Sequence, residues 1–254
     1  MRPLILAAFV VTVFGSGCGG TGLSAGGPLK VTFAEKHLVT IPIEDQEIIL
    51  PAKQEMDRAA LEQGRAESQR DGAKAKYDVA KNDEKEAKIG LSSAKSLKNA
   101  AGKGVDRNQQ NDAARGERVA DLRLRMAKAK KAFLEAKSKW LDGLAKYAKA
   151  NMYAKAARYE LEKAKIASAR NIRPSGFKLA DFDAQWQQRN QRANDLRRGV
   201  DDARRKAESK RADWITKEAE YRKTQGKDGA PEATAEALSA EAGAHEGGSV
   251  EPPQ

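Results

Sequence analysis

The fold of this chain is decided by residues 73–94, which read AKAKYDVAKNDEKEAKIGLSSA. Alanine stands at every seventh position here, and the register continues on both sides, through Ala52, Ala59, Ala66, Ala73, Ala80, Ala87, Ala94 and Ala101. A seven-residue repeat is typical of coiled coils, and so small a side chain lets two helices approach closely. The repeat predicts a helix over about 43–101, in which Pro51 marks either a kink or the helix start.

A second stripe of this helix lies three residues before the alanines. Its apolar members are Ile49, Met56, Tyr77 and Leu91, and polar Gln63, Arg70 and Glu84 interrupt it. Alanine layers bury little area, so each contributes about 1 kcal/mol or less. We expect local fraying near Gln63 and Arg70.

Two more helices follow from the same spacing. Gly102 and Gly104 favour a turn, after which a second helix is predicted over about 106–172, ended by Pro174. Its apolar face is wide, which indicates contact with two neighbouring helices. A third helix, over about 180–225, repeats apolar residues seven apart, at Leu179, Trp186, Ala193, Val200, Ala207, Trp214 and Tyr221.

These elements predict an all-α fold over 43–225, an elongated antiparallel three-helix coiled-coil bundle. Short connections favour antiparallel neighbours, so the second helix is expected to lie between the other two. Only 6% of the residues are aromatic, which makes a thick globular core hard to build. The aromatic residues on the repeats, Trp140, Tyr147, Trp186 and Trp214, are interpreted as core packing and not as a ligand site.

The first seventeen residues read as an export signal. Arg2 precedes an apolar run too short to span a bilayer, and small residues follow. Gly15, Ser16, Gly17 and Cys18 resemble a bacterial lipobox, although Gly15 stands where that family usually has leucine. The alternative is an ordinary secretory signal cleaved near Gly17 or Gly20. Either signal sends the mature chain out of the cytoplasm.

The lipobox resemblance implies that Cys18 becomes the first residue and carries a diacylglycerol and an amide-linked acyl chain. Several acyl chains hold a protein firmly on a membrane. In that family a residue other than Asp after the cysteine, here Gly19, commonly implies the outer membrane, with the protein facing the periplasm.

The segments outside the helices have distinct compositions. Residues 18–30 are rich in glycine, as in a flexible spacer between an anchor and a folded body. Apolar residues alternate imperfectly over 31–42, which predicts a short extended segment that packs along the helices or pairs with another molecule. Residues 226–254 are acidic and lack an apolar period, so we expect a disordered tail.

The positive charge concentrates in the second helix. Residues 107–173 hold 18 Lys and Arg against 7 Asp and Glu. One interpretation is a solvated helix exterior; the other is an anion-binding face centred on Arg123, Arg125, Lys128, Lys130, Lys131, Lys137 and Lys139. Export argues against nucleic acid as the partner. Anionic lipid, cell-wall polymer or an acidic protein remain, and so does the chain's own acidic tail.

The sequence predicts no enzyme. Only two histidines are present, His37 and His245, and neither has the spacing of a metal site or of a catalytic triad. A single cysteine excludes an intrachain disulfide and a cysteine-based metal site, and no cofactor is expected.

Residues 18–225 broadly resemble alanine-rich helical envelope lipoproteins. The resemblance implies a periplasmic scaffold that contacts peptidoglycan, anionic lipid or another envelope protein, with oligomerisation left open. One alternative is a helical accessory component of a trans-envelope efflux, secretion or motility complex. Another is a periplasmic holdase with basic helical arms.

Overall fold

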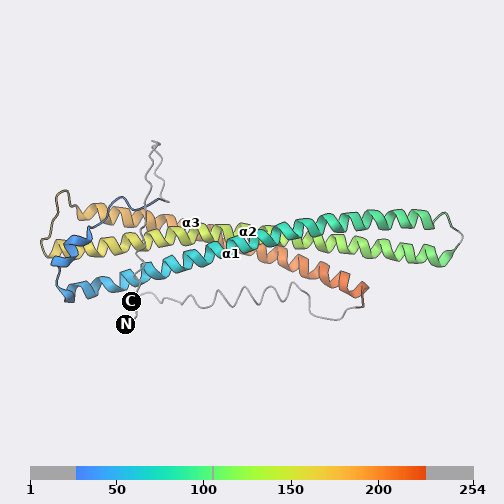
Figure 1. Cartoon of the computed structure of the whole chain (residues 1–254), viewed down its shortest axis with the longest axis horizontal. Helices are drawn as coiled ribbons and strands as arrows, with labels where there is room; N and C mark the ends of the chain where they lie inside the picture. Colours follow the sequence, from blue (N-terminus) through green and yellow to red (C-terminus); the bar gives the residue numbers. More distant parts are fainter. Residues whose placement is uncertain (1–26, 105, 227–254) are drawn as a thin grey trace, which may run out of the picture.

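The computed structural model describes residues 27–104 and 106–226, and this part of the chain is almost entirely helical (Figure 1). A short 3-10 helix, η1 (Glu35–Thr40), precedes three long α-helices. These are α1 (Ile43–Ala101), α2 (Arg107–Ala169) and α3 (Leu179–Thr224). The described residues contain no strand, so the all-α prediction is confirmed.

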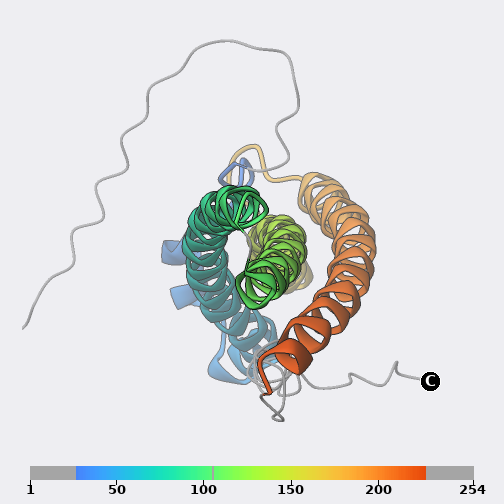
Figure 2. The ribbon, with the colours of Figure 1, turned by 90° about the vertical axis from the view of Figure 1, so that its right-hand side faces the viewer.

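The central helix is α2. It packs against both α1 and α3, which themselves scarcely touch, and the end-on view shows α2 between them (Figure 2). At about 1.5 Å per residue, the 63 residues of α2 extend for roughly 95 Å. The predicted antiparallel, elongated bundle with a central second helix is therefore correct.

The alanine repeat forms the contact between α1 and α2. Six of its eight alanines are buried, from Ala52 to Ala87, whereas Ala94 and Ala101 are half-buried. Opposite them, α2 contributes larger side chains, such as Leu124 against Ala87. Elsewhere alanine packs on alanine, as where Ala66 of α1 meets Ala145 and Ala148 of α2.

The contact between α2 and α3 has the larger aromatic residues. Trp214 is 1% exposed and stacks on Phe133, with their ring centroids 5.4 Å apart. Further along, the Cγ2 atom of Val200 would lie 3.7 Å from a Cβ at Gly143, so the two helices approach closely there. Core packing is confirmed for Trp214.

The two ends of the rod differ. We call the end that holds η1, the start of α1 and the α2–α3 loop the base; there all three helices are present (Figure 1). We call residues 88–104 and 106–123, which form the α1–α2 turn and its approach, the tip. No described residue of the tip is buried, whereas burial resumes at Ala87 on α1 and at Leu124 on α2.

The helix boundaries follow local capping. The Asp106 carboxylate accepts a hydrogen bond from the Asn108 amide at 2.8 Å, which caps the start of α2. The other end of α2 lies at Ala169, three residues before the prediction. Asn171 adopts φ 57°, and the Ile172 amide donates to the Ala167 carbonyl at 2.8 Å, so a left-handed residue ends the helix before Pro174 does.

Two expectations for the first part of the chain change. Helix α1 begins at Ile43 and continues through Pro51, so the alternative of a helix start at Pro51 is wrong. The predicted extended segment over 31–42 is also wrong in its second half, where residues 35–40 form η1. No partner strand lies beside η1, so its backbone forms local bonds, such as that from the His37 amide to the Ala34 carbonyl at 3.0 Å.

Candidate functional site

The most specific polar contacts hold the chain segment Pro28–Phe33, which we call the strap, against α2 and α3. The Gln185 side-chain amide pairs with Val31 as a neighbouring strand would. Its Nε2 donates to the Val31 carbonyl at 2.8 Å, and its Oε1 accepts from the Val31 amide at 3.0 Å. The same Oε1 accepts from the Lys30 amide at 2.9 Å. The Gln185 side chain thus forms hydrogen bonds with three backbone groups of the strap, as a neighbouring β-strand would do in a sheet.

A buried ion pair holds the end of the strap. Lys163 is 2% exposed, and its Nζ lies 2.6 Å from the Glu160 Oε1. Glu160 Oε2 accepts from the Phe33 amide at 2.6 Å, while Lys163 Nζ donates to the Phe33 carbonyl at 3.4 Å. Buried charges are tolerated only when paired and hydrogen-bonded, and here the backbone of Phe33 supplies those bonds.

Arg189 holds the start of the strap from α3. Its guanidinium lies 5.5 Å from the Tyr153 ring centroid and donates to the Pro28 carbonyl at 3.1 Å. The residue is 4% exposed, although arginine is rarely buried. The contact with the Tyr153 ring and the hydrogen bond to the Pro28 carbonyl together replace part of the hydration of the guanidinium.

Apolar side chains complete the attachment. Phe33 is 3% exposed and belongs to one cluster with Leu161 and Phe182, while Val31 packs at its margin. The arrangement binds the strap through its backbone and through two alternate apolar side chains, Val31 and Phe33. Of the segment 31–42 that was predicted to pack along the helices or to pair with another molecule, Val31 and Phe33 do pack along α2 and α3. The contacting groups include four polar residues that sequence reasoning missed: Glu160, Lys163, Gln185 and Arg189.

The basic run of α2 divides between two edges of that helix. Arg123, Lys130 and Lys137 are seven residues apart and follow one edge. Lys128 and Lys139 lie two residues from Lys130 and Lys137, which is about 200° round the axis, so they follow the other edge. The structure does not bring the seven predicted residues onto a single face.

Most of these cations lie beside carboxylates. Three of them pair with carboxylates of α1. Lys131 Nζ lies 2.7 Å from a Glu84 oxygen, and Lys130 Nζ lies 3.6 Å from an Asp83 oxygen. Arg123 Nη2 lies 2.6 Å from a Glu86 oxygen. Arg125 and Lys139 pair with Asp121 and Glu135 of their own helix at 2.7 and 2.6 Å. Lys137 Nζ lies 5.6 Å from the Phe133 ring centroid. Lys128 is exposed and has no ion-pair partner among the described residues.

The pair between Glu84 and Lys131 is the least exposed of those joining α1 and α2 in the described chain. Hydrogen bonds from Lys131 and then Lys88 hold the pKa of Glu84 below its usual value, and Glu84 raises the pKa of Lys131. Glu84 is 8% exposed and occupies a position of the second stripe. The interruption that the sequence displays at Glu84 is thus a cross-helix contact.

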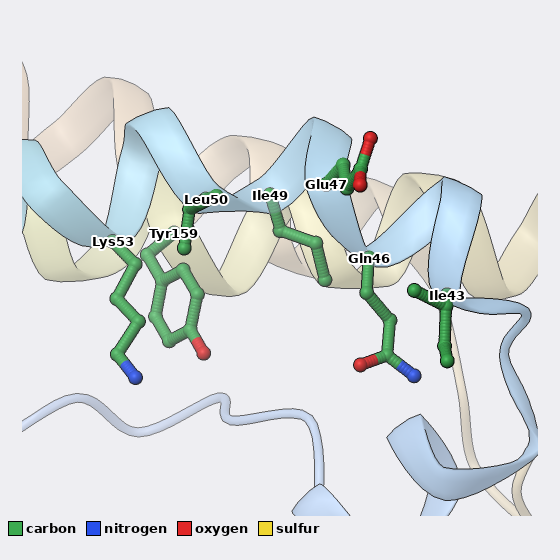
Figure 3. Close-up of a pocket in the computed structure, with 7 residues that line it drawn as sticks. All are labelled: Ile43, Gln46, Glu47, Ile49, Leu50, Lys53 and Tyr159. Atoms are coloured by element: carbon green, nitrogen blue, oxygen red, sulfur yellow. The ribbon is translucent and has the colours of Figure 1, made fainter.

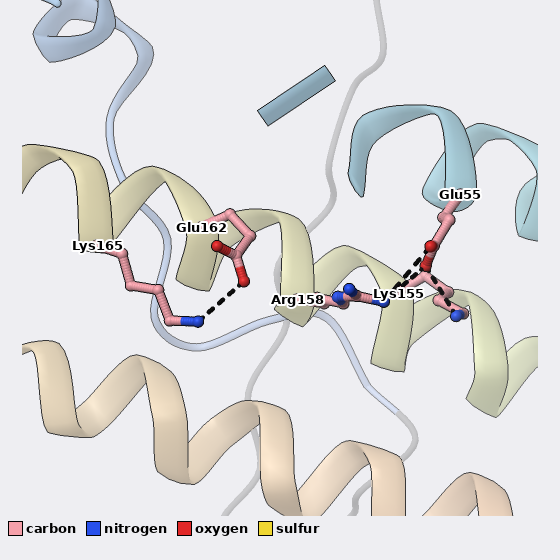
Figure 4. A network of polar contacts seen from close by, with 5 residues as sticks. All are labelled: Glu55, Lys155, Arg158, Glu162 and Lys165. Atoms are coloured by element: carbon pink, nitrogen blue, oxygen red, sulfur yellow. Dashed lines mark hydrogen bonds and ion pairs between the residues drawn. The ribbon is translucent and has the colours of Figure 1, made fainter. Parts of the chain in front are cut away.

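Similar pairs bind α1 to α2 from base to tip. Arg170 Nε lies 2.6 Å from Asp45 Oδ2 at the base, and Lys98 Nζ lies 2.6 Å from Glu117 Oε2 at the tip. Between them, Glu55 accepts from Lys155 at 2.9 Å and from Arg158 at 3.0 Å, whereas Glu162 and Lys165 pair along α2 alone (Figure 4). Partial burial acts to raise the pKa of Glu55, but its bond to Lys155 and the nearby cations outweigh that effect and lower it.

A shallow groove lies beside the strap at the base. It has a volume of about 260 Å³ and is lined on α1 by residues that include Ile43, Ile49, Leu50 and Lys53, and on α2 by Tyr159 (Figure 3). Burial raises the pKa of the Tyr159 hydroxyl. The groove combines the apolar side chains with polar Gln46 and Glu47 at its margin.

Other predicted features lie outside the described residues. They include Cys18, the export signal, His245 and residues 227–254 of the acidic tail. Within the described ranges, no cluster of His, Cys, Asp and Glu suits a metal ion, and none of the helices combines the length and apolar character that a bilayer crossing requires.

Comparisons with protein-family models, with curated proteins and with solved structures give no match to this chain.

Proposed function

We propose that this protein is a structural lipoprotein of a bacterial envelope, held in the outer membrane by acyl chains on Cys18 and facing the periplasm. The observation that carries the proposal is the strap. It fixes the chain to the bundle only ten residues after Cys18. Acyl chains on Cys18 would therefore hold the rod close to the membrane. The rod itself has the length of a spacer, and its exterior is rich in ion pairs. We propose no catalytic activity and no cofactor for it.

The partner is proposed to be peptidoglycan, an anionic lipid or another envelope protein. The exposed Lys128 supports an anionic partner, and Lys139 on the same edge of α2 is also exposed, although it pairs with Glu135 of its own helix. The opposite edge supports it less, because Lys130 and Arg123 already contact carboxylates of α1. In this proposal the anion-binding face is narrower than the seven residues of the basic run.

Lipidation is tested by replacing the only cysteine. Full-length protein should be recovered from envelopes with the mass of a chain that begins at Cys18 and carries acyl groups. Cys18→Ser should abolish that mass and release the protein from sedimenting membranes. If the substituted protein still sediments with membranes and its mass shows the same processing as the parent, Cys18 is not the membrane anchor.

The partner is tested by crosslinking in cells. A photo-crosslinking residue at position 128 should recover a partner, whereas the same residue at exposed Lys74 on α1 serves as the matched control. Muropeptides recovered from position 128 favour the scaffold. Subunits of an efflux, secretion or motility complex would instead favour an accessory role in such a machine.

A further inference from the structure

Exposed apolar side chains gather at the base of the rod. The described residues include eight large exposed hydrophobic side chains, and four of them fall between Val39 and Leu50. Val39, Ile43 and Leu50 are 84%, 73% and 50% exposed, and we call these three residues the basal patch. Ile43 and Leu50 are two helical turns apart, so they lie on one side of α1, and both line the groove. Ile48 is 61% exposed and lies off the line that joins Ile43 to Leu50, whereas the last four are spread singly along α1 toward the tip.

The strap determines how far the anchor lies from this patch. Between Cys18 and Gly27 the chain has nine residue steps, which span at most about 32 Å. Without the bonds to Gln185, Glu160 and Arg189, the tether would continue to Ile43 and would span at most about 90 Å if fully extended. The clamped strap therefore keeps the base near the point of anchorage.

The strap also begins close to the patch. Arg189 holds Pro28 and lies over Tyr153, while Tyr159 lines the groove beside Leu50. Tyr153 and Tyr159 are six residues apart on α2, or about 9 Å along its axis and about 240° around it, so the strap begins at the level of the groove but on another side of α2. A bilayer that holds the anchor is thus within reach of the basal patch.

We infer that the basal patch is a membrane-contact surface, whose three apolar side chains enter the interfacial region of the bilayer that carries the anchor. This inference rests on the proposed lipidation. A bilayer fits better than a second copy of the chain, because three side chains offer roughly a few hundred Å², below the ~1,000 Å² of a stable protein interface. Tethering makes so small a patch sufficient, since it raises the local concentration of membrane.

The test uses a polarity-sensitive fluorophore on the lipidated full chain. The sulfur of an acylated Cys18 is a thioether, so a cysteine introduced by Val39→Cys or Ile43→Cys is the only thiol that reacts. Leu97→Cys at the tip is the matched control, because Leu97 is apolar and 67% exposed. In vesicles of phosphatidylethanolamine and phosphatidylglycerol, emission from positions 39 and 43 should shift to the blue. Spin-labelled lipids should quench it several-fold more than emission from position 97.

A second arm separates the patch from the anchor. The full chain carrying Cys18→Ser, a hexahistidine tag at the anchor position and one of the same labels is attached to vesicles containing nickel-chelating lipid. If Cys18 is not lipidated in cells but position 43 is quenched in this arm, the proposed function fails and the patch stands. Equal quenching at positions 43 and 97 in both arms overturns the patch and leaves lipidation untouched.

Discussion

Ala80 gives the sharpest test of the close contact between α1 and α2. Its side chain is fully buried, in one cluster with Phe133 and Trp214. Ala80→Leu adds three carbon atoms where no space exists, and such overpacking costs about 1–3 kcal/mol. If the helices separate to admit leucine, the neighbouring layers at Ala73 and Ala87 each lose up to about 1 kcal/mol. We therefore expect a loss of about 1–5 kcal/mol in the free energy of unfolding.

Urea unfolding, followed by circular dichroism and by tryptophan fluorescence, measures this loss. Trp214 lies in the same cluster as Ala80 and serves as a local probe. Ala75→Leu is the matched control, because Ala75 is exposed on the same helix and should change stability by less than about 0.5 kcal/mol. Equal stability of the two variants would refute the argument that small residues set the helix separation.

Three further substitutions or conditions test other contacts. Trp214→Ala should lower the free energy of unfolding, measured by thermal unfolding, by about 3–5 kcal/mol. Trp214→Phe should lower it less, because the buried indole N–H that it removes has no hydrogen-bond partner among the described residues. Glu160→Ala should accelerate amide exchange at Phe33, which loses its acceptor, whereas Glu162→Ala should leave that exchange unchanged. The lowered pKa of Glu84 and of Asp45 means that both carboxylates stabilise the fold above the pKa of the unfolded chain. The melting temperature should therefore fall as the pH drops below about 4, and a constant value from pH 5 to pH 2 would contradict this.

The heptad pattern was sufficient to predict the helices and their neighbours. The alanine repeat predicted α1 over about 43–101, which agrees with Ile43–Ala101, although Pro51 left a later start open. The end was indicated by Gly102, which follows the helix. The wide apolar face predicted that α2 lies in the middle. These properties depend on periodic burial, which the spacing of residues expresses directly.

The strap could not be predicted in the same way. Alternating apolar residues indicate an extended chain, but they do not reveal that side chains of α2 and α3 replace a partner strand. Glu160 and Lys163 have the spacing of an ordinary solvated helix pair. A weak signal was available at Arg189, which occupies the gap in the stripe formed by Phe182, Leu196 and Ala203; the structure fills that gap with a buried cation. Burial of a polar side chain depends on a distant segment, and periodicity carries no information about it.

The unequal ends of the bundle have a mechanical consequence. Three helices share any sideways load near the base, but only two share it in the tip, where no described residue is buried. Resistance to bending rises steeply with cross-section, so deflection concentrates beyond the point where α3 leaves its neighbours. The three-helix part of the rod is therefore stiff and the two-helix tip is flexible under load. Trp214 lies close to the transition between these two parts.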